Sequence, residues 1–276
     1  MPDKLDPQDS AGRPNPFLKT LVDLYDFLGF AVLASVGSSV VTLAAGLLAG
    51  WFWEIAGPGR PCAVLPLLLL PPAAYWGLAS LAVACATREE PSWRHLLSAA
   101  GRVYPRVLLY GLMGPGGAAL AAGTAALWLV IGTPRVPEAN PTALGVAFGA
   151  LWAGAGLAWV CIWILGWPFM AMSGGRVGYS LRLAAAAVSA GPGIALVFAG
   201  HLAAALGVVL LPLAVSWQGV GIGLCIMFVV FIGPFYVALL SANVALDLAE
   251  RVRALKERLG AEQNTPAVEE EGADDA

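Results

Sequence analysis

Hydrophobic residues are arranged along this chain in six long, nearly uncharged runs that are separated by shorter polar segments. The runs cover residues 28–53, 62–86, 107–131, 142–172, 192–215 and 218–246. Each run has the roughly 20 residues that a helix needs to cross about 30 Å of hydrocarbon. Membrane-barrel strands instead alternate apolar and polar positions over about 10 residues. Because lipid-facing backbone must form its own hydrogen bonds, the pattern predicts six transmembrane α-helices.

The polar segments between the runs differ in length, and this difference predicts how the helices are connected. Short segments join the runs in pairs, giving three hairpins. Longer segments precede each hairpin, and residues 17–27, 90–103 and 177–190 have the spacing of short amphipathic helices that lie in a membrane interface. The predicted fold class is therefore an all-α polytopic membrane protein, with six transmembrane helices in three hairpins and short interfacial helices on the cytoplasmic side.

The same pattern sets the domain organisation. Residues 1–16 are polar and proline-rich and are predicted to be a disordered N-terminus, and residues 260–276 form an acidic tail that we also expect to be disordered. Residues 17–259 form one transmembrane domain. It divides into three units, 17–86, 87–172 and 176–250, which the sequence allows to be either an internal repeat or the product of similar constraints.

The positions of the basic residues predict the orientation. Thirteen of the 15 Lys and Arg side chains fall in segments on the same side as the N-terminus, and only Arg60 and Arg135 fall on the other side. The excess of positive charge on cytoplasmic loops places both termini in the cytoplasm.

Composition excludes several classes of protein. Hydrophobic residues make up 59% of the chain and charged residues 12%, about half the usual share, which argues against a disordered chain, a nucleic-acid-binding protein and a typical cytosolic enzyme. The four cysteines are far apart and lack metal-ligand spacing, so we expect no cofactor or metal. The expected partner is the lipid bilayer, with another membrane protein and a second copy of the chain as open alternatives.

Three short stretches resemble the YesL-like family of bacterial integral membrane proteins. They are residues 69–75 (LLPPAAY), 88–93 (REEPSW) and 241–246 (SANVAL). The family's asparagine-leucine-tryptophan stretch in the first span is replaced here by residues 36–39 (VGSS). The resemblance implies a multi-pass protein of the bacterial plasma membrane, without an established activity, in an accessory or transport-associated role.

Two features inside the spans are candidates for ligand contact. His201 is the ionisable residue deep in a span, and such groups often mark ion or proton paths, although an imidazole can also serve in packing. Trp152, Trp159 and Trp163 share one face of the fourth span at 100° per residue. This face could line a groove for an apolar ligand or interlock with a neighbouring helix.

A third candidate is a polar cluster at the cytoplasmic end of the bundle. Asn243, Asp247 and Glu250 share one face of the last span, and basic residues are predicted at a similar depth. These basic residues are Arg102, Arg106 and Arg182. The cluster could form a gate or carboxylate clamp, or structural pairs and solvated charges.

No recognisable catalytic motif occurs in the chain, and we expect no enzyme activity. The leading hypothesis is a non-enzymatic accessory or scaffold protein whose cytoplasmic face docks a partner. The alternative is a small transporter for an apolar or weakly polar solute that uses His201 and the tryptophan face.

Overall fold

The computed structural model describes residues 15–55, 62–97, 103–131, 142–214, 223 and 227–264. Every element assigned within these ranges is a helix. Five of the helices are long and apolar enough to cross a membrane, and a sixth span results if the bent pair of helices at 177–204 is taken as one. The prediction of an all-α polytopic membrane protein is confirmed.

The first unit consists of α1 (Pro16–Asp26), α2 (Leu28–Ile55) and α3 (Leu65–Ala86). Asn15 begins α1, because its side chain accepts a hydrogen bond from the backbone N–H of Phe17 at 3.0 Å. A single residue, Phe27, separates α1 from α2. The two helices are therefore almost continuous, and α1 cannot move far from the first span.

The second unit contains α4 (Trp93–Leu97), α5 (Tyr104–Ile131) and α6 (Ala143–Met172). Of the helix predicted over 90–103, the structure shows α4 alone, and residues 98–102 lie outside the described part. Thr142 caps α6, accepting from the N–H of Gly145 at 3.2 Å. Gly174 and Gly175 end the unit with a tight turn. Both have positive φ, a backbone conformation in which residues with a side chain are strained.

The third unit contains α7 (Val177–Ala190), α8 (Pro192–Ala214), the π-helical turn η3 (Met227–Ile232) and α10 (Gly233–Asn264). α7 and α8 meet at an angle of 104°. The first part of the predicted span 218–246 lies mostly outside the described residues. Ser35 of α2 supports the passage from η3 into α10, because its hydroxyl accepts from the N–H of Phe235 at 3.1 Å.

The three units pack through their last helices. α3, α6 and α10 each contact the other two and form the centre of the molecule. Around them, α2 contacts α3 and α10, α5 contacts α6 and α3, and α8 contacts α10 and α6. The short helices follow the same order, since α1 lies on α10, α4 on α3 and α7 on α6. The same set of contacts occurs three times in a closed ring, which favours three copies of one structural unit.

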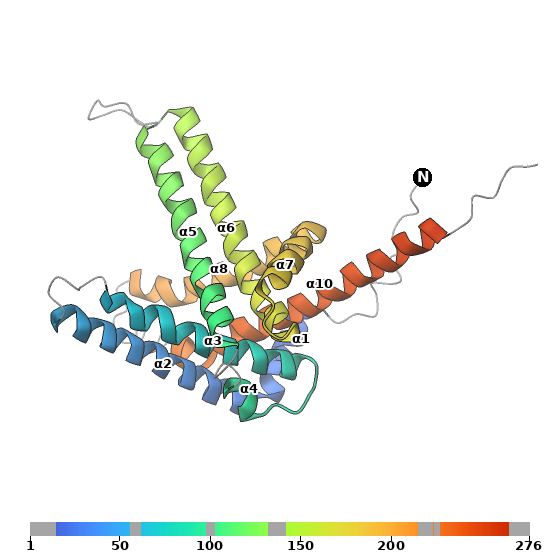
Figure 1. Ribbon diagram of the computed structural model, residues 1–276, viewed down its shortest axis with the longest axis horizontal. Helices are drawn as coiled ribbons and strands as arrows, with labels where there is room; N and C mark the ends of the chain where they lie inside the picture. Colours follow the sequence, from blue (N-terminus) through green and yellow to red (C-terminus); the bar gives the residue numbers. More distant parts are fainter. Residues whose placement is uncertain are drawn as a thin grey trace, which may run out of the picture.

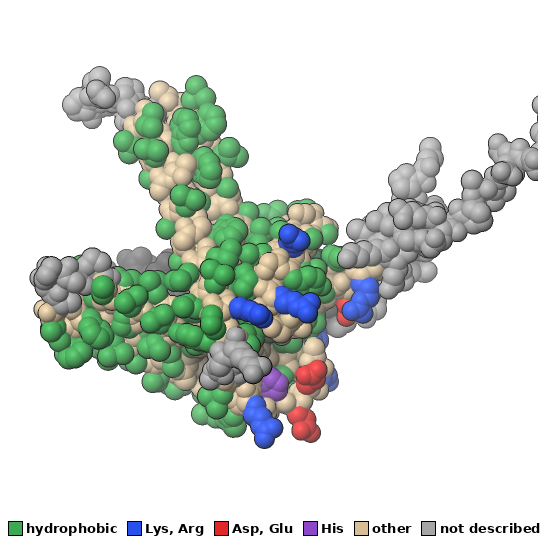
Figure 2. Space-filling model, viewed as in Figure 1, with side chains coloured by type: hydrophobic (Ala, Val, Ile, Leu, Met, Phe, Trp, Pro, Cys, Tyr) green, Lys and Arg blue, Asp and Glu red, His purple; other side chains and the backbone are tan. Residues whose placement is uncertain are grey.

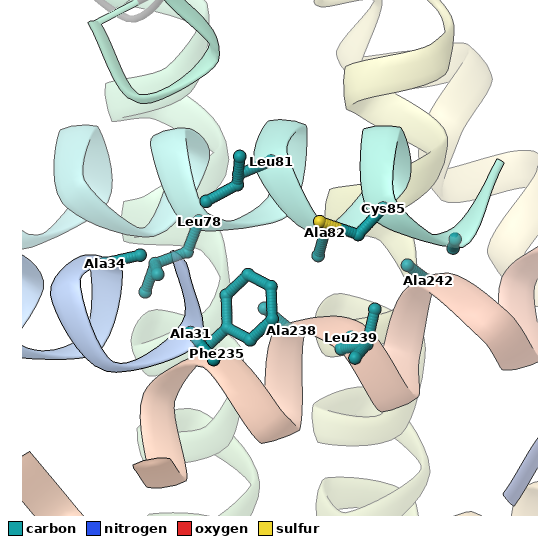
Figure 3. Packing of buried hydrophobic residues seen from close by; sticks show 11 residues of the cluster. Ala31, Ala34, Leu78, Leu81, Ala82, Cys85, Phe235, Ala238, Leu239 and Ala242 are labelled. Atoms are coloured by element: carbon teal, nitrogen blue, oxygen red, sulfur yellow. The ribbon is translucent and has the colours of Figure 1, made fainter. Parts of the chain in front are cut away.

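Small side chains allow the central helices to approach closely. In one core cluster the fully buried ring of Phe235 from α10 lies against α2 and α3 (Figure 3). Alanines on α2 and α10 and leucines on α3 surround the ring. In a membrane, where burial of apolar surface gains little, this kind of close packing holds helices together.

The α5–α6 hairpin projects away from α2, α3 and α8, as Figure 1 shows. Its contacts to the rest of the molecule are made near the end where the three hairpins meet, mainly with α3 and α7. Figure 2 shows apolar side chains over the α5–α6 hairpin and over the part that contains α2 and α3. Basic side chains gather at the end where the hairpins meet. Apolar surface of this extent suits lipid contact, and the basic end carries the polar residues considered next.

Candidate functional site

A buried polar cluster joins three helices at the basic end of the molecule. The Lys19 ammonium on α1 donates hydrogen bonds to Asn243 Oδ1 on α10 at 2.6 Å and to the carbonyl of Ala86, at the end of α3, at 2.7 Å. It also lies 3.3 Å from Asp23 Oδ2, one helical turn along α1. Three oxygens from three helices thus surround one cation.

Asn243 connects the cationic and anionic parts of this cluster. Its amide group donates to Asp23 Oδ2 at 3.1 Å and to the Thr20 hydroxyl at 3.2 Å, while its carbonyl oxygen accepts from Lys19. Thr20 in turn donates to the carbonyl of Pro16 at 2.7 Å. The side-chain amide donates to the carboxylate and accepts from the ammonium at once, which explains an asparagine at this position.

Burial makes these contacts important for stability. Asp23 is 1% exposed, Thr20 0% and Asn243 3%, whereas the side chain of Lys19 is 27% exposed. Removing one partner of a buried ion pair typically costs about 3–5 kcal/mol, because the other charge stays buried. One oxygen, Asp23 Oδ1, is buried without a hydrogen-bond partner among the described residues. The cluster therefore fixes α1 against α10 and α3.

Of this cluster, the pattern in the sequence predicted Asn243 alone. Lys19, Thr20 and Asp23 were missed because the polar face of an interfacial helix was expected to point to water. The structure turns that face into the protein. Their spacing along α1 does place the three on one side of a helix, and this was the available signal.

The other described members of the predicted cytoplasmic cluster have different surroundings. Asp247 pairs with Arg251 at 2.8 Å, one turn along α10. Arg106 and Arg182 are exposed, on α5 and α7, and Glu250 is exposed on α10. Arg102 lies outside the described residues.

Two of the predicted tryptophans lock α5 to α6. The indole N–H of Trp163 donates to the carbonyl of Tyr110 at 2.9 Å, and the Tyr110 hydroxyl donates back to the carbonyl of Trp163 at 2.8 Å. The Trp159 indole lies 3.2 Å from the carbonyls of both Met113 and Gly114. The structure thus places these rings in interlocking packing.

Glycines on α5 make room for the two indoles. A Cβ atom on Gly114 would overlap the ring of Trp163, and one on Gly117 would overlap the ring of Trp159. Trp152, nearer the other end of α6, is 37% exposed. The tryptophan face thus divides into a packed part and an exposed part.

His201 also takes part in packing. Its ring stacks on Phe17 of α1, with 4.4 Å between ring centroids and 18° between the planes. His201 Nδ1 lies 2.8 Å from the carbonyl of Val197, one turn earlier on α8. Because a carbonyl only accepts, Nδ1 carries the proton. This ring holds α8 to the start of α1, next to the buried cluster.

Among the described residues, no group of three or more His, Cys, Asp or Glu side chains is placed to hold a metal ion. Comparison of the chain with protein-family models, curated proteins and solved structures finds no match. The YesL-like resemblance stays a prediction, and the function must be inferred from the structure itself.

Proposed function

We propose that this protein is a non-enzymatic accessory protein of the bacterial plasma membrane that presents a helical arm to a partner in the cytoplasm. The observation that carries the proposal is the length of α10, which runs unbroken from Gly233 to Asn264. At 1.5 Å per residue, the part beyond Glu250 extends by about 20 Å. Figure 1 shows this part leaving the bundle.

The arm, residues 251–264 of α10, continues from a segment of the same helix that is packed in the bundle. Asn243, one of the buried members of the Lys19 cluster, lies on the same helix, and Leu248 is fully buried between α10 and its neighbours. Asp247 and Arg251 form an ion pair of the (i, i+4) type that supports a helix as it leaves the bundle. A partner that binds the arm would thus be held at a fixed place relative to the membrane.

The sequence of the arm suits pairing with another helix. The apolar position at Leu248 continues in the sequence at Val252, Leu255 and Leu259, four and three residues apart in turn. This is the spacing of helices that pair along one seam, and charged residues between these positions suit its edges. The class of partner we propose is a protein with a cytoplasmic amphipathic helix, such as a component of a membrane transport system.

The transporter alternative relied on His201 and the tryptophan face. Trp159, Trp163 and His201 are engaged in helix packing. No observation favours a solute path along these side chains, and the proposal does not use them.

Site-specific photo-crosslinking in native membranes tests the proposal. A benzophenone amino acid at Arg253, exposed on the arm, should give one discrete protein adduct. The same group at Leu47, which is 67% exposed on the apolar surface of α2, is the matched control and should not give that adduct. Replacing Val252 with Glu should remove the adduct while the protein keeps its thermal stability. Identical products from both positions, or none from Arg253, would refute the docking role.

A further inference from the structure

The first helix, α1, directs apolar side chains outward and polar side chains into the protein, the reverse of a helix on a water-exposed surface. Its exposed side carries a stripe of apolar side chains, with Leu18 61% exposed, Leu21 55%, Val22 47% and Tyr25 80%, and the charged Asp26 is exposed at the end of the helix. Its fully buried side chains are polar, namely Thr20 and Asp23, beside the partly buried Phe17 and Leu24. On a helix that faces water the two sets would be exchanged.

The apolar stripe of α1 is continuous with the membrane surface of the first span. Phe27 alone separates the two helices, and the exposed side of α2 carries large apolar side chains such as Leu28 and Leu33. α2 is one of the helices long and apolar enough to cross a membrane. The exposed apolar side chains of α1 thus follow directly, along the chain, on those of a helix suited to lipid contact.

The contacts on the inner side of α1 agree with this position. Lys19 reaches the carbonyl of Ala86, the last residue of the membrane-spanning helix α3, and Asn243, which lies within the apolar segment of α10. α1 therefore packs beside the ends of two spans and not beyond them. Its charged pair is neutralised inside the protein, where hydrogen bonds replace water.

We propose that α1 lies within the bilayer, in the leaflet nearer the basic loops, with the stripe formed by Leu18, Leu21, Val22 and Tyr25 in contact with acyl chains. The Lys19–Asp23–Asn243 cluster is then an intramembrane polar site that this helix shields from lipid. The inference goes beyond the accessory role proposed above and does not depend on it.

Electron paramagnetic resonance with single spin labels tests this position. In a variant without the four native cysteines, a nitroxide is placed at Leu21 or Val22, and the full-length protein is reconstituted into phosphatidylcholine–phosphatidylglycerol vesicles. Labels at Leu47 and Arg253 calibrate lipid and water exposure, since both side chains are exposed at the surface. Each label stands on an exposed position, so folding is retained, and the thermal transition of each variant verifies this.

The measured quantity is the ratio of collisions with oxygen, which concentrates in lipid, to collisions with a water-soluble nickel chelate. At Leu21 and Val22 we expect the ratio to resemble that at Leu47. A ratio like that at Arg253 would show that the stripe faces water and would overturn the proposal. Low collision rates with both reagents would mean that protein, such as a second copy of the chain, covers the stripe, and this too would overturn it.

Discussion

Replacing Gly114 with alanine gives the sharpest test of the packing between α5 and α6. A Cβ at this position would overlap the indole of Trp163, so the ring must shift and its hydrogen bond to the Tyr110 carbonyl, now 2.9 Å, must break. Gly116 is the matched control two residues away on the same helix, where an added Cβ meets no atom within 4 Å.

The expected magnitude follows from three contributions. Overpacking costs about 1–3 kcal/mol, and a lost interhelical hydrogen bond in a membrane costs about 0.6 kcal/mol. Alanine regains up to about 1 kcal/mol of helix propensity over glycine. Gly114→Ala should therefore lower the free energy of unfolding by about 2 kcal/mol, whereas Gly116→Ala should leave it unchanged or raise it by up to about 1 kcal/mol.

Titration with sodium dodecyl sulfate in mixed micelles, followed by tryptophan fluorescence, measures both variants under the same conditions. Adding Gly114→Ala to a Trp163→Leu background should cost much less than in the natural chain, because the clashing ring is gone. Equal stability of the Gly114 and Gly116 variants would show that the indole does not lie over Gly114, and the reasoning would fail.

Three further predictions concern single residues, and each is measured by the same titration. Asn243→Ala should lower the free energy of unfolding by about 3 kcal/mol, because it removes two hydrogen bonds to charged groups; a loss below about 1 kcal/mol would contradict the buried cluster. His201→Phe should preserve the free energy of unfolding because it keeps the stack on Phe17, whereas His201→Ala should lower it by about 1 kcal/mol. An equal loss of stability in both variants would assign the effect to the imidazole nitrogen. Tyr110→Phe, which deletes one hydroxyl bonded at 2.8 Å, should cost about 0.6 kcal/mol, and a cost several times larger would require a further partner for this hydroxyl.

The helices could be predicted from the sequence because lipid leaves few alternatives. A backbone in hydrocarbon must satisfy its own hydrogen bonds, so an uncharged run such as the one in α2 specifies both a helix and its length. The shared face of Trp159 and Trp163 likewise follows from helical spacing alone. Whether that face is open or packed depends on the register of α5, which places Gly114 and Gly117 opposite the rings. Spacing along α6 contains no information about that register.

The buried cluster shows a different limit of sequence reasoning. Lys19 and Asp23 on a short amphipathic helix are indistinguishable, in the sequence, from charges that face water. Their inward orientation depends on Asn243, which is 224 residues from Lys19 along the chain. A pairing over this distance leaves no local pattern. Asn243 itself was recognisable because it shares one face of the last span with Asp247 and Glu250.

The contact between α1 and α10 has a consequence for synthesis of the protein. The ribosome makes α1 before α10, so the partner of Lys19 and Asp23 on α10 does not exist while the intervening spans are being made. These contacts of α1 therefore form only after α10 has been made. A chain released before α10 would keep the charged side chains of α1 without their partner Asn243.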